Sequence, residues 1–314
     1  MVSLNINLPN DFLNEEVRCG YLITREMKKV WAVELDLLAE FNRVCKKYHI
    51  NYCADAGTLL GAIRHNGFIP WDNDIDLAMT RAEYEKLCKV APQEFKEPYF
   101  FQTEETDPGT VRCHAQLRNS QTTGMLIFEK EMGCRFNQGI FLDIFPFDAV
   151  PLNKNELIKF YNRLYKKKKK LHSIMWNYKY FYPHIKKKKN GKFDWQEGVR
   201  RFLKHIQYQI TKPDYKKVFE DFNRECQKYN LDENTNMIAA FCLLIGMDRI
   251  QRFREDFDDL IEVDFEFLKI PVFRQYDRDL KILYGPNYMT PIQAETVHGN
   301  IFFDAEKPYT KYLN

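Results

Sequence analysis

Apolar residues recur at helical spacing between residues 15 and 48, which predicts a long amphipathic helix at the start of the chain. Its apolar face would comprise Val17, Tyr21, Met27, Trp31, Leu35, Leu38, Phe41 and Cys45. Shorter apolar segments, which predict strands, follow at residues 50–54, 99–103, 113–119, 124–128 and 139–145. Thr80 and Glu83 have capping-box spacing and predict a helix to about residue 90. This alternation predicts an α/β (α+β) fold, a mixed sheet flanked by helices.

The last third of the chain repeats this alternation of elements. Residues 237–247 are apolar and uncharged and predict a buried helix, whereas residues 261–273 predict a strand. Residues 276–283 predict a helix that Gly285 and Pro286 would end.

The middle of the chain is strongly basic, although the net charge of the whole protein is only +3. Residues 151–217 contain 20 Lys and Arg against 4 Asp and Glu, and lysine runs at 166–170 and 186–189 flank the aromatic segment 176–182. Such a region can be a solvated helix face, can contact an anionic membrane or glycan, or can bind single-stranded nucleic acid. We keep a membrane contact through residues 166–189 beside the solvated face and expect no nucleic-acid partner.

The cysteines and the N-terminal sequence indicate the cellular compartment of the protein. Eight cysteines occur without a Cys-x-x-Cys pair, which predicts free thiols in a reducing compartment. Asp11, Glu15, Glu16 and Arg18 interrupt any signal-peptide pattern, and residues 237–247 are too few to span a bilayer. We therefore expect a cytoplasmic protein that could lie at the inner membrane face. With 25 Phe and 18 Tyr, its 314 residues can bury a sizeable core.

Three aspartates alternate with other residues directly after a proline-led turn. In a β-strand, Asp72, Asp74 and Asp76 would share one face, while Ile75 and Leu77 would point into the core. Neighbouring carboxylates repel one another, and a hard cation such as Mg²⁺ (or Mn²⁺) removes that conflict by taking oxygen ligands from carboxylates and phosphates. The pattern predicts a metal-dependent phosphoryl-transfer site. The alternative, an acidic turn, fits the apolar neighbours less well.

A small-residue turn, Gly57-Thr58, lies where the strand at 50–54 would lead into a short helix ending near Arg64. Backbone N–H groups at a helix N-terminus, with a hydroxyl beside them, bind phosphate, and an ordinary helix cap is the alternative. A glycine turn, a short helix and a strand carrying Asp-x-Asp is the layout of the nucleotidyltransferase fold. Arg64 could contact a donor phosphate or be an exposed helix-terminal arginine.

These motifs resemble the LicD family of phosphocholine transferases, to which the fukutin group is related. The resemblance is carried by residues 56–61, 71–76, 139–148 and 284–291. It covers roughly residues 45–150 and 265–295 of the chain. The chain has Asn73 where the family usually has Asp, and on strand alternation residue 73 points away from the metal face, so this change would remove no ligand.

We expect the chain to divide into three parts. Residues 1–150 would form the N-terminal helix and a nucleotidyltransferase-like catalytic core. Residues 151–235 would be a basic helical insertion facing an acceptor or a membrane, and residues 236–314 would supply helices and a strand that complete the core.

Asp143 is the only charged residue in the apolar segment 140–145 and needs a compensating partner if it is buried. A metal ion shared with Asp74 and Asp76 would provide one, and the alternative is a buried Asp that caps a neighbouring helix. In the resembled family a basic residue is common at the position of Arg118, which implies that Arg118 faces the donor phosphates. A salt-bridged arginine at a strand edge is the alternative.

The resemblance implies an enzyme that transfers a phospho-alcohol, most simply phosphocholine from CDP-choline, to a sugar hydroxyl of a cell-surface glycan or lipid-linked saccharide. The catalytic, metal-binding residues would be Asp72, Asp74, Asp76 and Asp143, with one or two Mg²⁺ or Mn²⁺ ions. The residues that bind the CDP-linked donor would be Gly57, Thr58, Arg64 and Arg118. Two alternatives remain: transfer of a nucleoside monophosphate from an NTP, and a non-catalytic glycan-binding protein.

Overall fold

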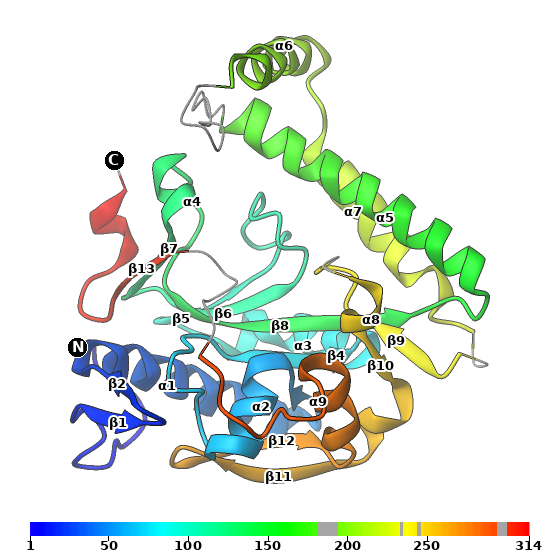
Figure 1. Cartoon of the computed structure of the whole chain (residues 1–314). Coiled ribbons are helices and arrows are strands. Elements are labelled where there is room, and N and C mark those ends of the chain that lie inside the picture. The colour runs from blue at the N-terminus through cyan, green and yellow to red at the C-terminus, as the bar shows by residue number, and fades with distance from the viewer. Residues whose placement is uncertain (181–193, 233–234, 244–245, 294–299, 314) are drawn as a thin grey trace.

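A seven-stranded mixed sheet forms the centre of the protein (Figure 1). The computed structural model describes residues 1–180, 194–232, 235–243, 246–293 and 300–313. The strands run in the order β10-β9-β8-β4-β3, and β6, with β5 beyond it, pairs with the first half of β8. Their bounds are β3 Cys53–Ala54, β4 Asp76–Thr80, β5 Tyr99–Gln102, β6 Ala115–Asn119, β8 Ile140–Ala149, β9 Met237–Ala239 and β10 Gln251–Phe253.

Helices cover this sheet and confirm the predicted fold class. Those that pack against its strands are α1 (Arg25–Tyr48), α2 (Ala56–His65) and α3 (Arg81–Glu94), and α9 (Tyr276–Tyr284) packs on α2. The remaining short helices near the sheet are α4 (Ile127–Glu131), α8 (Met247–Ile250), η2 (Gln227–Tyr229), η3 (Arg254–Asp258) and η4 (Tyr309–Tyr312). Three two-stranded sheets complete the fold: β1 (Glu16–Arg18) with β2 (Tyr21–Ile23), β11 (Leu260–Phe265) with β12 (Leu268–Phe273), and β7 (Thr123–Leu126) with β13 (Ile301–Asp304).

The first helix begins ten residues later than the apolar pattern predicted. Residues 16–23 form the β1–β2 hairpin, whose turn is made by Cys19 and Gly20 with φ of 52° and 75°. A left-handed turn of this kind cannot occur inside a right-handed helix. Thr24 then caps α1, because its hydroxyl oxygen accepts the N–H of Met27 at 3.3 Å. The prediction of a continuous helix over residues 15–48 was therefore wrong for its first third.

Two C-terminal predictions are also corrected. The apolar segment that begins at Met237 starts with strand β9, which pairs with β8 and β10, instead of a helix. A short apolar stretch fits a buried strand and a buried helix equally well, and pairing with the sheet decides it. The strand predicted at 261–273 is a hairpin that turns at Glu266, whose φ is 54°. The helix predicted at 276–283 is confirmed as α9 and ends at Gly285, with φ of 83°.

The basic middle of the chain forms a helical arm that projects from the sheet (Figure 1). It consists of α5 (Lys154–Ile174), the π-helical turn η1 (Met175–Lys179), α6 (Trp195–Thr211) and α7 (Tyr215–Cys226). Helices α5 and α7 run alongside one another, and α6 lies at the far tip. The lysine run at 186–189 lies outside the described residues. Within the described ranges, no helix is both long enough and apolar enough to cross a bilayer.

Candidate active site

Asp76 and Asp143 lie side by side on neighbouring strands. Strands β4 and β8 are parallel, and Asp76 is the register partner of Asp143. The N–H of Asp143 donates to the carbonyl oxygen of Ile75 at 2.8 Å, which fixes this register. Both aspartates are buried. Because register partners in a sheet point to the same face, the structure places Asp143 beside Asp76 of the Asp-x-Asp motif, and a metal ion shared with Asp74 and Asp76 stays a prediction.

Asp72 and Asp74 lie in the connection that leads into β4, and the strand itself begins only at Asp76. The expectation that one strand carries all three aspartates is therefore corrected. A turn in which the N–H of Asp72 donates to the carbonyl of Ile69 at 2.8 Å precedes the strand. Trp31 Nε1 donates to the Asp72 carbonyl at 3.0 Å, so the buried indole holds this connection from the side of α1.

The N-terminus of α2 touches Asp72. A Cβ atom at Gly57 would lie 2.7 Å from Oδ2 of Asp72, so any larger residue would require that carboxylate to move. Glycine therefore lets the first turn of α2 approach this carboxylate without displacing it. The structure thus brings the predicted glycine turn and the predicted acidic motif together.

Thr58 connects α2 to the acidic strand. Its buried hydroxyl oxygen accepts the backbone N–H of Asp76 at 2.8 Å. This bond satisfies the first N–H of β4 and holds the position of the Asp76 backbone relative to the helix. Thr58 therefore has a positioning contact, and its role in donor binding stays a prediction.

Glu34 is a fifth carboxylate at the site, and the sequence analysis did not identify it as a site residue. It projects from α1, is 1% exposed, and its Oε2 has no hydrogen-bond partner within the described part of the chain. Burial raises the pKa of Glu34 well above its usual value, and the negative charges of four residues raise it further: Asp74, Asp72, Asp143 and Asp76. The charges of all four predicted aspartates therefore act on the buried carboxyl of Glu34. The available signal was an acidic residue inside the apolar stretch 30–38.

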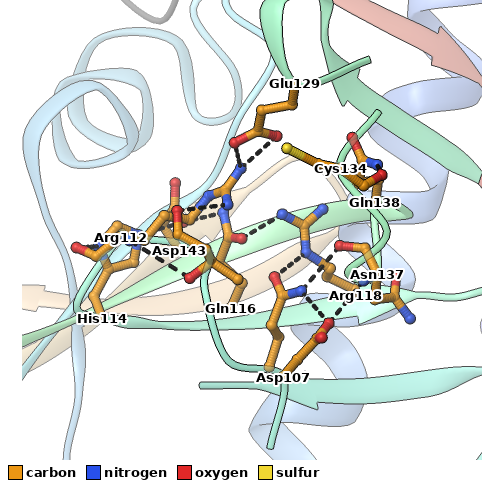
Figure 2. A network of polar contacts seen from close by, with 12 residues as sticks. Asp107, Arg112, His114, Gln116, Arg118, Glu129, Cys134, Asn137, Gln138 and Asp143 are labelled. Carbon is orange, nitrogen blue, oxygen red and sulfur yellow. Dashed lines mark hydrogen bonds and ion pairs between the residues drawn. The ribbon is translucent and has the colours of Figure 1, made fainter. Parts of the chain in front are cut away.

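Asp143 is held by a pair of side chains from β6 and the residue before it (Figure 2). Its Oδ1 receives His114 Nε2 at 2.9 Å and the amide of Gln116 at 2.6 Å. Burial by itself would raise the pKa of Asp143, but His114, Gln116 and the nearby Arg112 hold it below its usual value. The alternation of His114 and Gln116 along a strand next to β8 was the sequence signal for this arrangement.

The side chain of Arg118 does not lie where it was predicted, facing the donor phosphates. The guanidinium is fully buried, and its donors bind Gln102 Oε1 at 2.5 Å, the Gly139 carbonyl at 2.6 Å and the Gln116 amide oxygen. Burial and the charge of Arg112 lower the pKa of Arg118 to about 9. Arg118 orients Gln116, which in turn binds Asp143 (Figure 2). It is therefore a positioning residue inside the core.

Arg64 lies at the other end of α2 from Gly57, a separation of about 10 Å along the helix axis. Its Nη1 donates to the carbonyl of Tyr288 at 2.7 Å, and its Nε donates to His65 Nε2 at 2.8 Å. Burial lowers the pKa of Arg64. These contacts connect the C-terminal segment to α2, and a contact of Arg64 with the donor stays a prediction.

Tyr284 brings the C-terminal motif to the aspartates. Its side chain is 39% exposed, but partial desolvation of the hydroxyl raises its pKa, and the charges of Asp76, Asp55 and Asp72 raise it further. Asp55 itself is engaged by the buried guanidinium of Arg252 at 3.0 Å and does not cap α2. The site therefore gathers residues from α1, α2, β4, β6, β8 and α9.

A family model supports the same interpretation of these residues. The model for LicD/FKTN/FKRP, described as a nucleotidyltransferase domain, matches residues 49–226. This is more than half of the chain. The chain belongs to the LicD family. It is a LicD-type phosphotransferase.

Individual relatives are consistent with that family. Lipopolysaccharide cholinephosphotransferase LicD of Haemophilus influenzae is 28% identical over 275 residues, which cover 83% of this chain and 91% of the relative. Uncharacterized proteins of Rickettsia prowazekii and Rickettsia typhi are 37% and 36% identical over 57 residues, 18% of this chain. These shorter matches cover 21% and 18% of the two rickettsial proteins.

The LicD family match contains most but not all of the site. It begins at residue 49 and includes the start of α2, the aspartates of β4 and its lead-in, Asp143, and the arm as far as α7. Glu34 and Tyr284 lie outside it. The LicD domain is therefore completed by α1 before it and by α9 after it.

The residues of this LicD site fit a divalent cation by their chemistry. They are hard carboxylate oxygens, and Oε2 of Glu34 is buried without a hydrogen-bond donor among the described residues. In the described part of the chain, no three Asp, Glu, His or Cys side chains lie close enough together to hold a metal ion between them.

Proposed function

We propose that the protein transfers phosphocholine from CDP-choline to a sugar hydroxyl of a cell-surface glycan. The observation that carries this proposal is the pairing of Asp76 with Asp143 beside the N-terminus of α2. The similarity to a lipopolysaccharide cholinephosphotransferase over most of both chains supports the choice of group and acceptor. A lipid-linked saccharide is the corresponding acceptor class.

The donor diphosphate would lie between the aspartates and the first turn of α2. Gly57 has no side chain to block the helix N–H groups, and Asp55 is engaged by Arg252 instead of capping them. Helix N-termini favour phosphate because their N–H groups and the helix dipole both attract negative charge. Phosphate next to carboxylates is unfavourable by itself, so the donor and a cation would bind together.

Asp72, Asp74, Asp76 and Asp143 would hold Mg²⁺ or Mn²⁺. Such an ion, when bound, neutralises charge on the phosphate oxygens and helps to align the reacting groups. The chain's own residues fix the geometry: Thr58 holds the backbone of Asp76, while His114 and Gln116 occupy Oδ1 of Asp143. The remaining Oδ2 of Asp143 is the atom that would accept a proton from the acceptor hydroxyl or face the cation. Phosphoryl transfer relies on such positioning and needs no covalent nucleophile.

The arm would face the acceptor side of the reaction. Helix α5 carries eight Lys or Arg and one Glu, which suits a glycan or membrane surface of negative charge. The enzyme would then work peripherally at a membrane on which its acceptor is anchored.

The test uses the purified protein with Mg²⁺ and a lipopolysaccharide core oligosaccharide as acceptor. CDP-choline, CDP-ribitol, CDP-glycerol and NTPs are supplied in separate reactions, and the released nucleotide is identified. We expect CMP and a phosphocholine-bearing product from CDP-choline alone. Release of pyrophosphate from an NTP, with no CMP from any CDP-alcohol, would instead favour nucleotidyl transfer, the activity that the family description names.

A further inference from the structure

Helix α6 at the tip of the arm exposes an apolar stripe. The stripe follows helical spacing through Trp195, Val199, Phe202, Leu203, Ile206 and Ile210. Val199, Leu203 and Ile210 are 57%, 60% and 77% exposed. Figure 1 shows α6 at the far end of the arm from the sheet. Large apolar side chains gathered on one exposed face mark an interaction surface.

The opposite face of α6 is the one that packs, and it does so through polar contacts. Tyr208 is buried, and its hydroxyl lies 3.0 Å from the hydroxyl of Ser173 on α5. His205 Nδ1 lies 2.7 Å from the carbonyl of Asn177 in η1. The helix is thus seated with its polar side inward and its apolar side outward, the reverse of an ordinary surface helix.

Cations border the stripe on the side that faces α5. Arg200 and Lys204 border both the apolar hollow of α6 and a basic groove between α6 and α5. On the α5 side that groove is lined by Lys166, Lys169 and Lys170, all exposed. None of these three lysines has a carboxylate partner among the described residues. Glu197 also lines the groove and lies 3.9 Å from Arg200, so the surface combines apolar side chains with an excess of positive charge from the three α5 lysines.

We propose that α6 docks on an anionic phospholipid membrane, lying parallel to it with the apolar stripe inserted at the boundary of headgroups and acyl chains. The arrangement matches an interfacial amphipathic helix, in which apolar insertion and attraction to anionic lipid add together. Long Lys and Arg side chains at the edges of the stripe can extend to the lipid phosphates. A second copy of the chain fits less well, because a symmetric contact would bring the same cations together.

The proposal deepens the function given above, since it says how the enzyme would reach a membrane-anchored acceptor. Vesicle binding, however, requires neither donor nor acceptor. A failure of membrane docking and a failure of phosphocholine transfer are therefore separate results.

The experiment measures co-sedimentation of the full-length protein with vesicles of phosphatidylglycerol and phosphatidylcholine in equal parts, and with vesicles of phosphatidylcholine alone. The test variant combines Val199→Ser, Leu203→Ser and Ile206→Ser. The control combines Leu152→Ser and Leu231→Ser, which remove apolar side chains that lie away from α6 and are more exposed than those of the test variant. We expect binding to anionic vesicles that falls about tenfold or more in the α6 variant and stays unchanged in the control.

A second measurement avoids multiple substitutions. Brominated lipids should quench part of the tryptophan fluorescence of the wild-type protein, and Trp195→Phe should remove that part. The proposal would be overturned if the wild type did not bind the vesicles, or if the α6 substitutions left binding unchanged. It would also be overturned if the quenching persisted in Trp195→Phe. A dimer in solution that the α6 substitutions dissociate would overturn it as well, because the stripe would then be an interface between copies.

Discussion

Asp76 on β4 and Asp143 on β8 are register partners in one parallel ladder, so two carboxylates far apart in the chain are fixed on the same face of the sheet. The backbone bonds that set this register leave neither residue free to move away. With Glu34 buried nearby, the protein keeps an accumulation of negative charge that its fold alone does not require. Such an arrangement, unfavourable for stability, is typical of a functional site.

Asp74→Asn should abolish transfer without unfolding the protein. Loss of one such electrostatic group typically lowers the rate by about 100- to 1,000-fold. Thermal unfolding without added cation should occur at the same or a higher temperature, because one charge acting on Glu34 disappears. The matched control is Asp264→Asn, an exposed residue of β11 paired with Lys269. Full transfer by Asp74→Asn, or by the wild type in excess chelator, would contradict the assignment.

His114→Ala should weaken the site by releasing Oδ1 of Asp143. Removal of a side chain that orients a metal ligand usually costs about 10- to 100-fold in metal affinity or activity. We expect weaker Mg²⁺ binding by calorimetry and a lower kcat, with partial recovery in His114→Gln, which retains a hydrogen-bond donor. An unchanged Mg²⁺ affinity in His114→Ala would show that this residue does not position Asp143.

Arg118→Met should destabilise the fold, because it leaves Gln102, Gln116 and the Gly139 carbonyl buried without their donor. Breaking a buried polar cluster of this kind costs about 3–5 kcal/mol. Arg118→Lys should also destabilise, since an ammonium cannot reproduce the planar fork of the guanidinium. Urea denaturation gives the measurement. A phosphate-facing arginine would produce the opposite result, with normal stability and a raised KM for the donor.

Asp279→Asn should make stability less dependent on pH. Burial raises the pKa of Asp279 to about 6, an effect that Arg252 only partly offsets. The unfolded residue loses its proton near pH 3.9, so the folded state binds the extra proton between about pH 4 and 6 and the wild type loses stability as pH rises through that window. Above pH 6 the variant should be more stable by about 1–3 kcal/mol, and the difference should vanish below about pH 4. A difference that is constant from pH 4 to pH 8 would show that this carboxyl is not responsible.

Much of the fold followed from local patterns. The alternation of apolar segments located β5, β6 and β8 to within a few residues, and the turn chemistry of Gly285 located the end of α9. The errors arose where tertiary contacts decide between equally good local structures. Met237 joins a strand because β8 offers an unpaired edge, and residues 16–23 form a hairpin because Cys19 and Gly20 adopt left-handed conformations.

The site residues that belong to a sequence motif could be predicted. Those that reach the site only through the tertiary fold could not. Asp76 and Asp143 stood out as charges in apolar strands, so their convergence could be inferred. Glu34 reaches the same point from a helix far away in the sequence, and its spacing matches no motif. Arg118 was expected to face the donor phosphates, but the structure buries it against polar partners that no local pattern identifies.

Mn²⁺ binding, measured by the loss of the free-ion EPR signal in the presence of CDP-choline, tests the shared site most directly. The samples are the wild type, Asp76→Asn, Asp143→Asn and the double variant, with Asp264→Asn as control. If the two aspartates share one ion, each single variant should lose about as much binding as the double variant. Wild-type binding in either single variant would contradict a common cation site on β4 and β8.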